Sequence, residues 1–346
     1  MKNLIKFLSG LVMMVVIGLI LTTCDEGSGN PACTHDWGEF VKISDPSFIS
    51  RGIETASCKV TGCIATKNNY FGEQQKIMNN SDWNAARALI TKAGEYTLVI
   101  GSNFSVSGST AFTFGSITNI SVTILGNNYT MTLSSVGNML RINANQTVTM
   151  DDLKFAGFTS NNASVVDVQN NNVTFIMKGN SSISGNTRSS SSTWGVGGWF
   201  CSGVLFNSTD GTFIMQDNAS ISNNIMNMTI GNYEPPMVSI VYCAGGVHIQ
   251  RGNFIMRNNT SIFGNIINCS RAPDSGSLIG GGVVLYSGTF RFIGGIIYGN
   301  DASPSSLRNT TNFGSAAFAR QGTATYGGVN GTSFNLASSS NTISVP

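Results

Sequence analysis

Three cysteines and a histidine near the start of the 346-residue chain could form a metal site or a disulfide. They are Cys33, His35, Cys58 and Cys63, and the last two form a C-x4-C pair. Thiolate and imidazole ligands of this kind hold tetrahedral zinc, whereas cysteines in exported proteins more often form disulfides. Because the pair is looser than a C-x2-C pair, the sequence favours a disulfide among these cysteines and no metal, with zinc as the open alternative.

The acidic residues that could do acid–base chemistry are few and dispersed. Asp152 and Asp217 fall at matching repeat positions, and Asp151, Lys178 and Arg257 would form an outward row. A polysaccharide lyase or hydrolase needs carboxylates that converge on one groove. We interpret the row as a solvated charge ladder. The sequence thus favours a non-enzymatic role without cofactor, and it leaves a carbohydrate-active enzyme, or its polysaccharide-binding relative, as the alternative.

Four connections between the predicted strands carry side chains suited to contact with a partner. All four leave from the same repeat position, so we expect them to emerge on one side as irregular loops. The connections are residues 187–196, 225–243, 266–279 and 301–313. Aromatic and arginine side chains are enriched at binding hot spots. The candidate binding residues are Trp194, Trp199, Tyr233, Arg188, Arg271 and Arg308. Alternatively, the loops fold down and their aromatics only cover the core.

A sequence repeat must position these residues. Similar segments begin at residues 173, 211, 252 and 288, and each holds short strands separated by Gly and Asn corners. Such strands bury an apolar face only when copies stack. The stacked positions are Phe175, Phe213, Phe254 and Phe290 inside, Ile183, Ile221 and Ile262 in a second row, and Asn186, Asn224, Asn265 and Asn300 at a corner. The repeat predicts an all-β chain folded as a single-stranded parallel β-helix.

The same alignment predicts a covalent link between neighbouring repeats. Cys201 and Cys243 precede a Gly-Val strand by three or four residues in successive repeats. Stacked strands lie about 4.8 Å apart, within the Cα separation of a disulfide. We predict a Cys201–Cys243 bridge, with two buried free thiols as the alternative. His248 follows Val247 on a strand, and we expect it to point outward.

The ends of the β region need protection from solvent and from other chains. Residues 81–93 predict a short helix, with Ala85, Ala88, Leu89 and Ala93 on one face, placed to cover the first open end of the stack. At the other end, residues 327–346 resemble weak final strands without a cap. An exposed sheet edge is expected there.

The first residues have the features of an export signal. Lys2 and Lys6 precede an apolar run over residues 11–21 that is too short to span a bilayer. The run leads into Leu-Thr-Thr-Cys, which resembles a bacterial lipobox with Cys24 as the lipidated residue. We predict an exported protein, anchored to the envelope by lipid alone, at the outer membrane or cell surface. Asp25 leaves the inner membrane as an alternative.

Composition narrows the partners, and the patterns divide the chain. Only 10% of residues are charged, and without Lys2 and Lys6 the bases equal the acids in number. A neutral chain offers no charge-based case for nucleic acid. The predicted divisions are residues 1–23 as signal, 24–32 as tether, 33–67 as a small Cys/His/Trp module, 68–93 as linker and helix, and 94–346 as β-helix.

The repeat pattern GGV-x(n)-GTFxM-x(5)-I-x-GN, over about residues 80–346, resembles the β-helix repeats of spirochaete surface lipoproteins. It is also similar to the polymorphic outer-membrane protein repeats of Chlamydiae. The resemblance implies a right-handed, pectate-lyase-like solenoid of an exported protein. With a lipid anchor, the expected function is a rigid stalk that displays loops for adhesion, or for binding a host or envelope protein or glycan.

Overall fold

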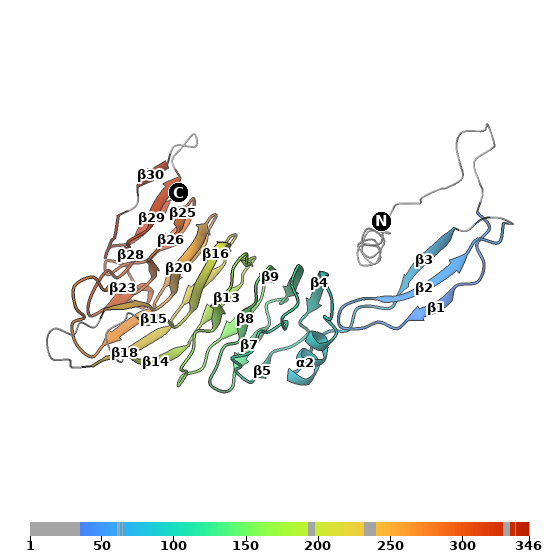
Figure 1. The fold of residues 1–346 in the computed structure, drawn as a ribbon, viewed down its shortest axis with the longest axis horizontal. Helices are drawn as coiled ribbons and strands as arrows, with labels where there is room; N and C mark the ends of the chain where they lie inside the picture. Colours follow the sequence, from blue (N-terminus) through green and yellow to red (C-terminus); the bar gives the residue numbers. More distant parts are fainter. Residues whose placement is uncertain are drawn as a thin grey trace.

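The computed structural model describes residues 35–60, 63, 65–192, 198–231, 240–327, 333–335 and 337–345. Strands are the main secondary structure of these residues and helix is almost absent, so the predicted all-β class is confirmed. Their helical elements are α2 (Asn80–Ala88) and the short 3-10 helix η1 (Ser305–Leu307). Figure 1 shows a small sheet at the N-terminal end, then α2, then strands side by side in sequence order toward the C-terminus.

The small N-terminal sheet is antiparallel and largely exposed. It consists of β1 (Val41–Ser44), β2 (Gly52–Ser57) and β3 (Thr66–Phe71), in that order. Of the described residues between 41 and 71, only Gly52 and Ala56 are buried. The described part of this module therefore has no substantial apolar core of its own.

The largest sheet runs along the whole β region. Its path consists of β4 (Gly94–Val99), β6 (Ile120–Leu125), β9 (Gln146–Asp151), β12 (Thr174–Lys178), β16 (Val204–Met215), β20 (Val247–Met256), β25 (Thr289–Phe292), β29 (Thr323–Gly327) and β30 (Ser333–Asn335). Shorter strands pair with it or with one another, namely β8 (Leu140–Ile142), β11 (Val166–Val168), β24 (Val283–Leu285) and β28 (Phe318–Arg320). From β4 to β29 every pairing is parallel.

A second long sheet accompanies the first. Its strands are β5 (Phe104–Val106), β7 (Thr130–Leu133), β10 (Lys154–Ala156), β13 (Ser182–Ser184), β17 (Ser220–Ser222), β21 (Ser261–Phe263), β26 (Gly295–Ile297) and β31 (Ile343–Val345). Each repeat contributes one strand to each long sheet, so the apolar faces of successive repeats form one continuous core.

The predicted inward rows are confirmed. Phe175, Phe213, Phe254 and Phe290 are register partners with no exposed surface. Their successive ring centroids are 5.1, 4.9 and 4.7 Å apart, and their planes are nearly parallel. The row of Ile183, Ile221 and Ile262 is likewise paired and fully buried.

The buried asparagine row differs from the prediction at its last member. Asn224 Oδ1 accepts from the backbone N–H of Asn186 at 3.2 Å, and Asn265 Oδ1 accepts from that of Asn224 at 3.1 Å. The next acceptor is Asn309 Oδ1, at 2.9 Å from the N–H of Asn265. Asn300 is exposed. The prediction failed there because the last repeat has an extra segment between its strand and its corner, which moves the corner nine residues along the chain.

The glycine of each Gly-Val pair is required by close packing between repeats. A Cβ at Gly203 would lie 2.3 Å from the carbonyl oxygen of Gly246, and one at Gly246 would lie 2.6 Å from that of Gly282. Atoms essentially never approach so closely, so larger residues would push the strands apart. This contact explains why the glycine recurs before Val204, Val247 and Val283.

The helix forms where expected, but its register and bounds differ from the prediction. Its N-cap is Asn79, whose side chain accepts from the N–H of Asp82, and the helix ends at Ala88 rather than residue 93. The buried side chains are Trp83, Ala86 and, just beyond the helix, Ile90. All four residues of the predicted alanine-rich face are exposed. The bulky Trp83 removes more apolar surface from water than small alanines, so it decides the buried face.

The four connections predicted as irregular loops contain strands of their own. One sheet consists of β14 (Thr187–Ser192), β18 (Ile225–Ile230), β22 (Ile266–Cys269) and β27 (Thr310–Thr311), and another of β15 (Gly198–Cys201), β19 (Val241–Ala244) and β23 (Leu278–Gly280). All these pairings are parallel. We call the two sheets together the side lobe.

At the C-terminal end each long sheet finishes with a short antiparallel strand. β30 pairs antiparallel with β29, and β31 pairs antiparallel with β26. The chain thus reverses direction and adds a last strand to each of the two long sheets. β30 and β31 are therefore the outermost strands of the two sheets, which agrees with the expectation of final strands at a sheet edge.

Candidate functional site

The side lobe has an apolar core separate from that of the long sheets. Buried side chains from both of its sheets meet there, namely Met226, Met228, Ile230, Val241, Cys243, Ile267, Cys269 and Ile279. Since strands with a packed core are rigid, the lobe can hold surface side chains in a fixed arrangement.

Alternation along β15 and β19 separates the two faces of the inner lobe sheet. Phe200 and Cys243 are register partners and contribute to the lobe core. Trp199 and Tyr242 are also register partners, so they lie on the opposite face. Trp199 packs there against a second buried cluster that includes Cys201 and lies between this sheet and the long sheet.

Three half-buried aromatic rings meet at the rim of that cluster. Trp199 and Tyr242 stack with centroids 4.3 Å apart and an interplanar angle of 13°. The ring of Tyr286 stands edge-on to both, at 4.4 Å from Trp199 and 4.7 Å from Tyr242. We call these three residues the aromatic triad. Each retains partial exposure, so part of the triad is open to solvent.

Two groups of this region, Tyr242 and His248, have pKa values shifted toward their neutral forms. Burial raises the pKa of Tyr242, and the neighbouring Tyr286 adds to this effect. His248 lies behind the triad, 5.6 Å from the Trp199 ring, with no exposed surface. Its burial lowers its pKa to about 4. The prediction that His248 points to solvent was wrong, because the lobe sheet covers the outer face of β20.

Sequence reasoning identified one member of the triad and missed two. Trp199, Tyr242 and Leu278 each stand five residues before the valine of a Gly-Val pair, so an alignment on those valines places them in one row. That signal was present in the sequence. Tyr286 follows β24 and comes close only through the fold.

The predicted arginines do not gather at the triad. Arg188 is tied into the fold, since it donates to the carbonyl oxygen of Cys201 at 3.0 Å and to Ser164 Oγ at 3.3 Å. Arg271 donates to the carbonyl oxygen of Gly231.

The other predicted binding residues lie away from the triad or outside the described residues. Arg308 is exposed and donates to the carbonyl oxygen of Ala302 at 2.8 Å. Trp194 and Tyr233 lie outside the described residues.

The predicted Cys201–Cys243 bridge is absent, and both thiols are free and buried. The strands are paired as expected, but Cys201 faces Ala244 while Cys243 faces Phe200. The one-residue offset places the two sulfur atoms on opposite faces of the sheet. Cys201 stands three residues before Val204, whereas Cys243 stands four residues before Val247. This difference of one residue is why the two thiols do not meet. Cys269, which had no expected partner, is also a free thiol.

The candidate acids are used in turns and ion pairs. Lys178 Nζ lies 3.0 Å from Asp151 Oδ2, as the predicted charge row requires. Asp152 has a φ of 50° and accepts from the N–H of Asn180 at 2.7 Å, while Asp217 has a φ of 59° and accepts from the N–H of Gly179 at 3.0 Å. These hydrogen bonds give both aspartates a structural role at repeat corners.

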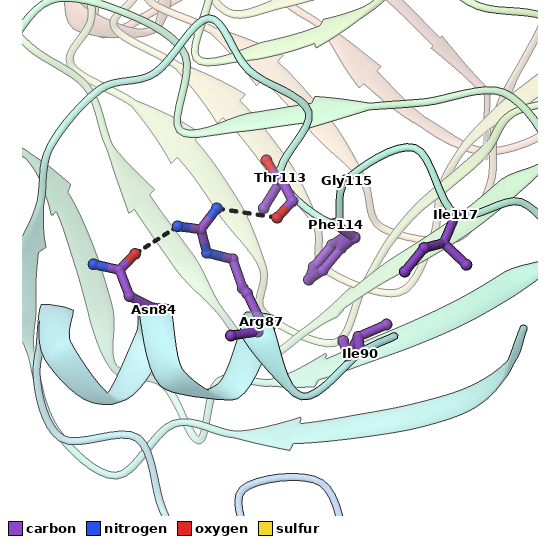
Figure 2. Close-up of a pocket in the computed structure, with 8 residues that line it drawn as sticks. Asn84, Arg87, Ile90, Thr113, Phe114, Gly115 and Ile117 are labelled. Atoms are coloured by element: carbon purple, nitrogen blue, oxygen red, sulfur yellow. Dashed lines mark hydrogen bonds between the residues drawn. The ribbon is translucent and has the colours of Figure 1, made fainter. Parts of the chain in front are cut away.

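A pocket of ≈ 290 Å³ lies between α2 and the segment around Phe114. Figure 2 shows Arg87 crossing it, with one nitrogen donating to the carbonyl oxygen of Thr113 at 3.0 Å and another to Asn84. The described residues that line the pocket include no carboxylate. We assign it to the packing of the helix rather than to chemistry.

The N-terminal module contains the residues that could hold a metal. His35, Cys58 and Cys63 offer ligand atoms that all lie within 4.8 Å of one another. Cys58 and Cys63 are free thiols, so the predicted disulfide does not link these two. Cys33 and the lipidation candidate Cys24 lie outside the described residues, and a bridge to Cys33 stays a prediction.

No family model, curated protein or solved structure matched the chain. In the part of the chain that the structure describes, no helix has the length and hydropathy needed to cross a membrane.

Proposed function

We propose that this chain is an exported, lipid-anchored surface protein whose parallel β-helix displays a glycan-binding side lobe. The basic start, the short apolar run and the lipobox-like Leu-Thr-Thr-Cys support export and lipidation at Cys24. The site of anchoring is the outer membrane or cell surface, in keeping with the resemblance to spirochaete surface lipoproteins. Both steps rest on the sequence.

Parallel pairing that continues from repeat to repeat supports the β-helix. Each repeat adds one strand to each long sheet, and identical side chains stack inside. Consecutive strands of one chain form such sheets only if the chain winds around a common axis. We propose the right-handed, pectate-lyase-like winding, because crossovers between parallel strands are right-handed in nearly all proteins.

The aromatic triad carries the binding part of the proposal. Aromatic rings pack against the C–H faces of sugar rings, and tyrosine hydroxyls exchange hydrogen bonds with sugar hydroxyls. Trp199 and Tyr242 come from neighbouring repeats, so their rings follow the long axis of the stack. A site of three half-buried rings without paired charge is small for a protein interface, which typically buries about 800 Å² on each partner. We therefore choose a glycan as the ligand.

The test begins with the full mature chain, purified in detergent and applied to an array of host and bacterial glycans. We expect the chain to bind at least one glycan on the array. Titration calorimetry with that glycan then gives the Kd. Trp199→Ala and Tyr242→Ala should each raise Kd at least about tenfold, the usual effect of losing a hot-spot ring. Tyr298→Ala is the matched control, because Tyr298 forms a half-buried aromatic pair with Phe263 on another sheet.

Three outcomes would contradict the proposal. One is that the chain binds no glycan on the array. A second is that Tyr298→Ala loses as much affinity as the two triad variants. The third is release of soluble oligosaccharides, detected by mass spectrometry, which would point instead to a carbohydrate-active enzyme.

A further inference from the structure

Three side chains from separate segments of the N-terminal module point their ligand atoms at one place. His35 precedes β1, Cys58 directly follows β2, and Cys63 lies in the connection to β3. Their sulfur and ring nitrogen atoms all lie within 4.8 Å of one another. This cluster is remote in sequence from the aromatic triad, and an inference from it stands apart from the proposed function.

Backbone hydrogen bonds fix the three segments relative to one another. Trp37 and Cys58 form an antiparallel bridge, beside which the N–H of Lys59 donates to the carbonyl oxygen of Asp36 at 2.7 Å. The N–H of Cys63 donates to the carbonyl oxygen of Val60 at 2.9 Å, which fixes the backbone that carries the second thiol. The cluster is therefore built by the fold of the sheet and does not depend on flexible side chains alone.

The distance within the cluster fits a metal ion. Zn–S bonds of about 2.3 Å and Zn–N bonds of about 2.0–2.1 Å at a tetrahedral angle place the sulfur and nitrogen atoms about 3.6 Å apart. Cys63 Sγ lies 3.5 Å from His35 Nδ1. Among the described residues, the other ring nitrogen of His35 is buried without a hydrogen-bond partner. Among the described groups, the thiols and the stacked Trp37 ring are therefore what holds the imidazole in place.

The module also needs a cross-link for stability. Its three strands bury very little surface. Of its described apolar side chains from 41 to 71, only Phe48 and Ile49 pack on the main core. Small units without an apolar core usually depend on disulfides or a structural metal. Cys58 and Cys63 are free thiols, so a metal is the cross-link that the described residues can supply.

We propose that His35, Cys58 and Cys63 bind a structural zinc ion. Two thiolates and one imidazole form a ligand set that selects Zn²⁺ over Mg²⁺ or Ca²⁺, which prefer oxygen ligands. On binding, each thiol releases its proton to solvent, and the imidazole coordinates in its neutral form. The proposal rests on these three ligands, and the fourth position is open to water or another group.

The experiment measures the metal content of the full chain, produced without an affinity tag of histidines and purified in detergent without chelators. Plasma mass spectrometry should find about one zinc per chain. Replacement by Co²⁺ should give the thiolate-to-metal charge-transfer absorption of a tetrahedral site. Cys58→Ser, Cys63→Ser and His35→Ala should each reduce bound zinc at least about tenfold, because each removes a direct ligand.

Two further variants separate loss of a ligand from loss of folding. His35→Cys replaces one zinc ligand by another, so it should retain zinc and strengthen the charge-transfer band. Cys269→Ser is the matched control, since Cys269 is a free buried thiol of the side lobe, and its zinc content should be unchanged.

The proposal is overturned if the wild-type chain contains no zinc after dialysis against Zn²⁺ and back. It is equally overturned if the chain mass is lower by two hydrogen atoms and peptide mapping finds a disulfide at Cys58 or Cys63. Retention of zinc by all three ligand variants would also refute it. Glycan binding can survive each of these results, so the two proposals fail separately.

Discussion

His248 lies without exposed surface between the side lobe and the long sheet. Its Nδ1 donates to the carbonyl oxygen of Phe200 at 3.3 Å, and its other nitrogen is buried without a hydrogen-bond partner. Burial lowers its pKa from 6.5 to about 4, and the positive charge of the nearby Arg188 acts in the same direction. Folding therefore requires the neutral imidazole.

Acid should destabilise the protein through His248. Between pH 6.5 and 4 the unfolded chain binds a proton that the folded chain does not, so the free energy of unfolding falls as the pH is lowered through this range. A shift of this size corresponds to about 3 kcal/mol, fully present above pH 6.5 and lost by about pH 4. Urea unfolding of wild type and His248→Gln at pH 7.5, 5.5 and 4 measures it.

Comparison with His248→Gln separates the titration of His248 from the titration of other buried groups. Burial raises the pKa of Asp167, which stabilises the fold in acid and would mask part of the loss. Because Asp167 is present in both proteins, the difference between them should shrink with falling pH. Parallel pH profiles for the two proteins would show that His248 does not titrate as the structure implies.

The phenylalanine row should carry a large part of the stability of the stack. Phe213 has no exposed surface and contacts the rings of Phe175, Phe206 and Phe254. Phe213→Ala should cost about 3–5 kcal/mol, from lost apolar burial and the cavity it leaves. Ile214→Ala, on the half-exposed outer face of the same strand, should cost about 1 kcal/mol. The midpoint of urea unfolding, at constant slope, measures both, and equal costs would contradict a packed interior row.

At the scale of the elements, the buried asparagine row joins one repeat to the next. Asn309 Oδ1 accepts from the N–H of Asn265, and its Nδ2 donates to the carbonyl oxygens of Ile262 and Tyr298 at 2.8 and 2.7 Å. Asn309→Ala leaves these buried groups unpaired, and we expect a loss of about 2–4 kcal/mol in the free energy of unfolding. Asn300→Ala, at the exposed position, should stay within about 0.5 kcal/mol of wild type. Urea unfolding that ranks the two variants in the opposite order would refute the row.

The inward rows could be predicted from the sequence because each repeat places the same residue type at the same step. Stacking then follows from alternation along a strand, as Phe175 and Ile183 illustrate. The side lobe could not be predicted in this way. The Ser-rich β14 has the composition of a loop, and its pairing with the parallel neighbour β18 makes it a strand. Tyr286 was missed for a similar reason, because it reaches Trp199 only across the fold, whereas Tyr242 could have been found by alignment on the Gly-Val pairs.

At the scale of the whole molecule, the two ends of the stack differ. At its start, Trp83 and Ala86 of α2 are buried on the main core. At its end, the chain reverses and adds a three-residue antiparallel strand to each long sheet, so that the outermost strands are very short. A stack of parallel strands otherwise presents rows of unpaired N–H and C=O groups at its last repeat, and these pair readily with another chain.

Removal of residues 328–346 should therefore turn a monomer into an associating protein. The deletion takes away β30 and β31 and uncovers the backbone edges of β29 and β26. We expect sedimentation velocity to show concentration-dependent dimers and larger species for the truncated chain, while the full chain stays monomeric in the same detergent. Asp301→Ala offers a milder form of the test. Asp301 accepts from the N–H and hydroxyl of Thr342 at 2.7 Å each, so its loss frees the start of β31 without shortening the chain. Association should then be weaker than in the truncated chain but measurable. A truncated chain that remains monomeric at every concentration would mean that the last repeat does not depend on its antiparallel strands for protection.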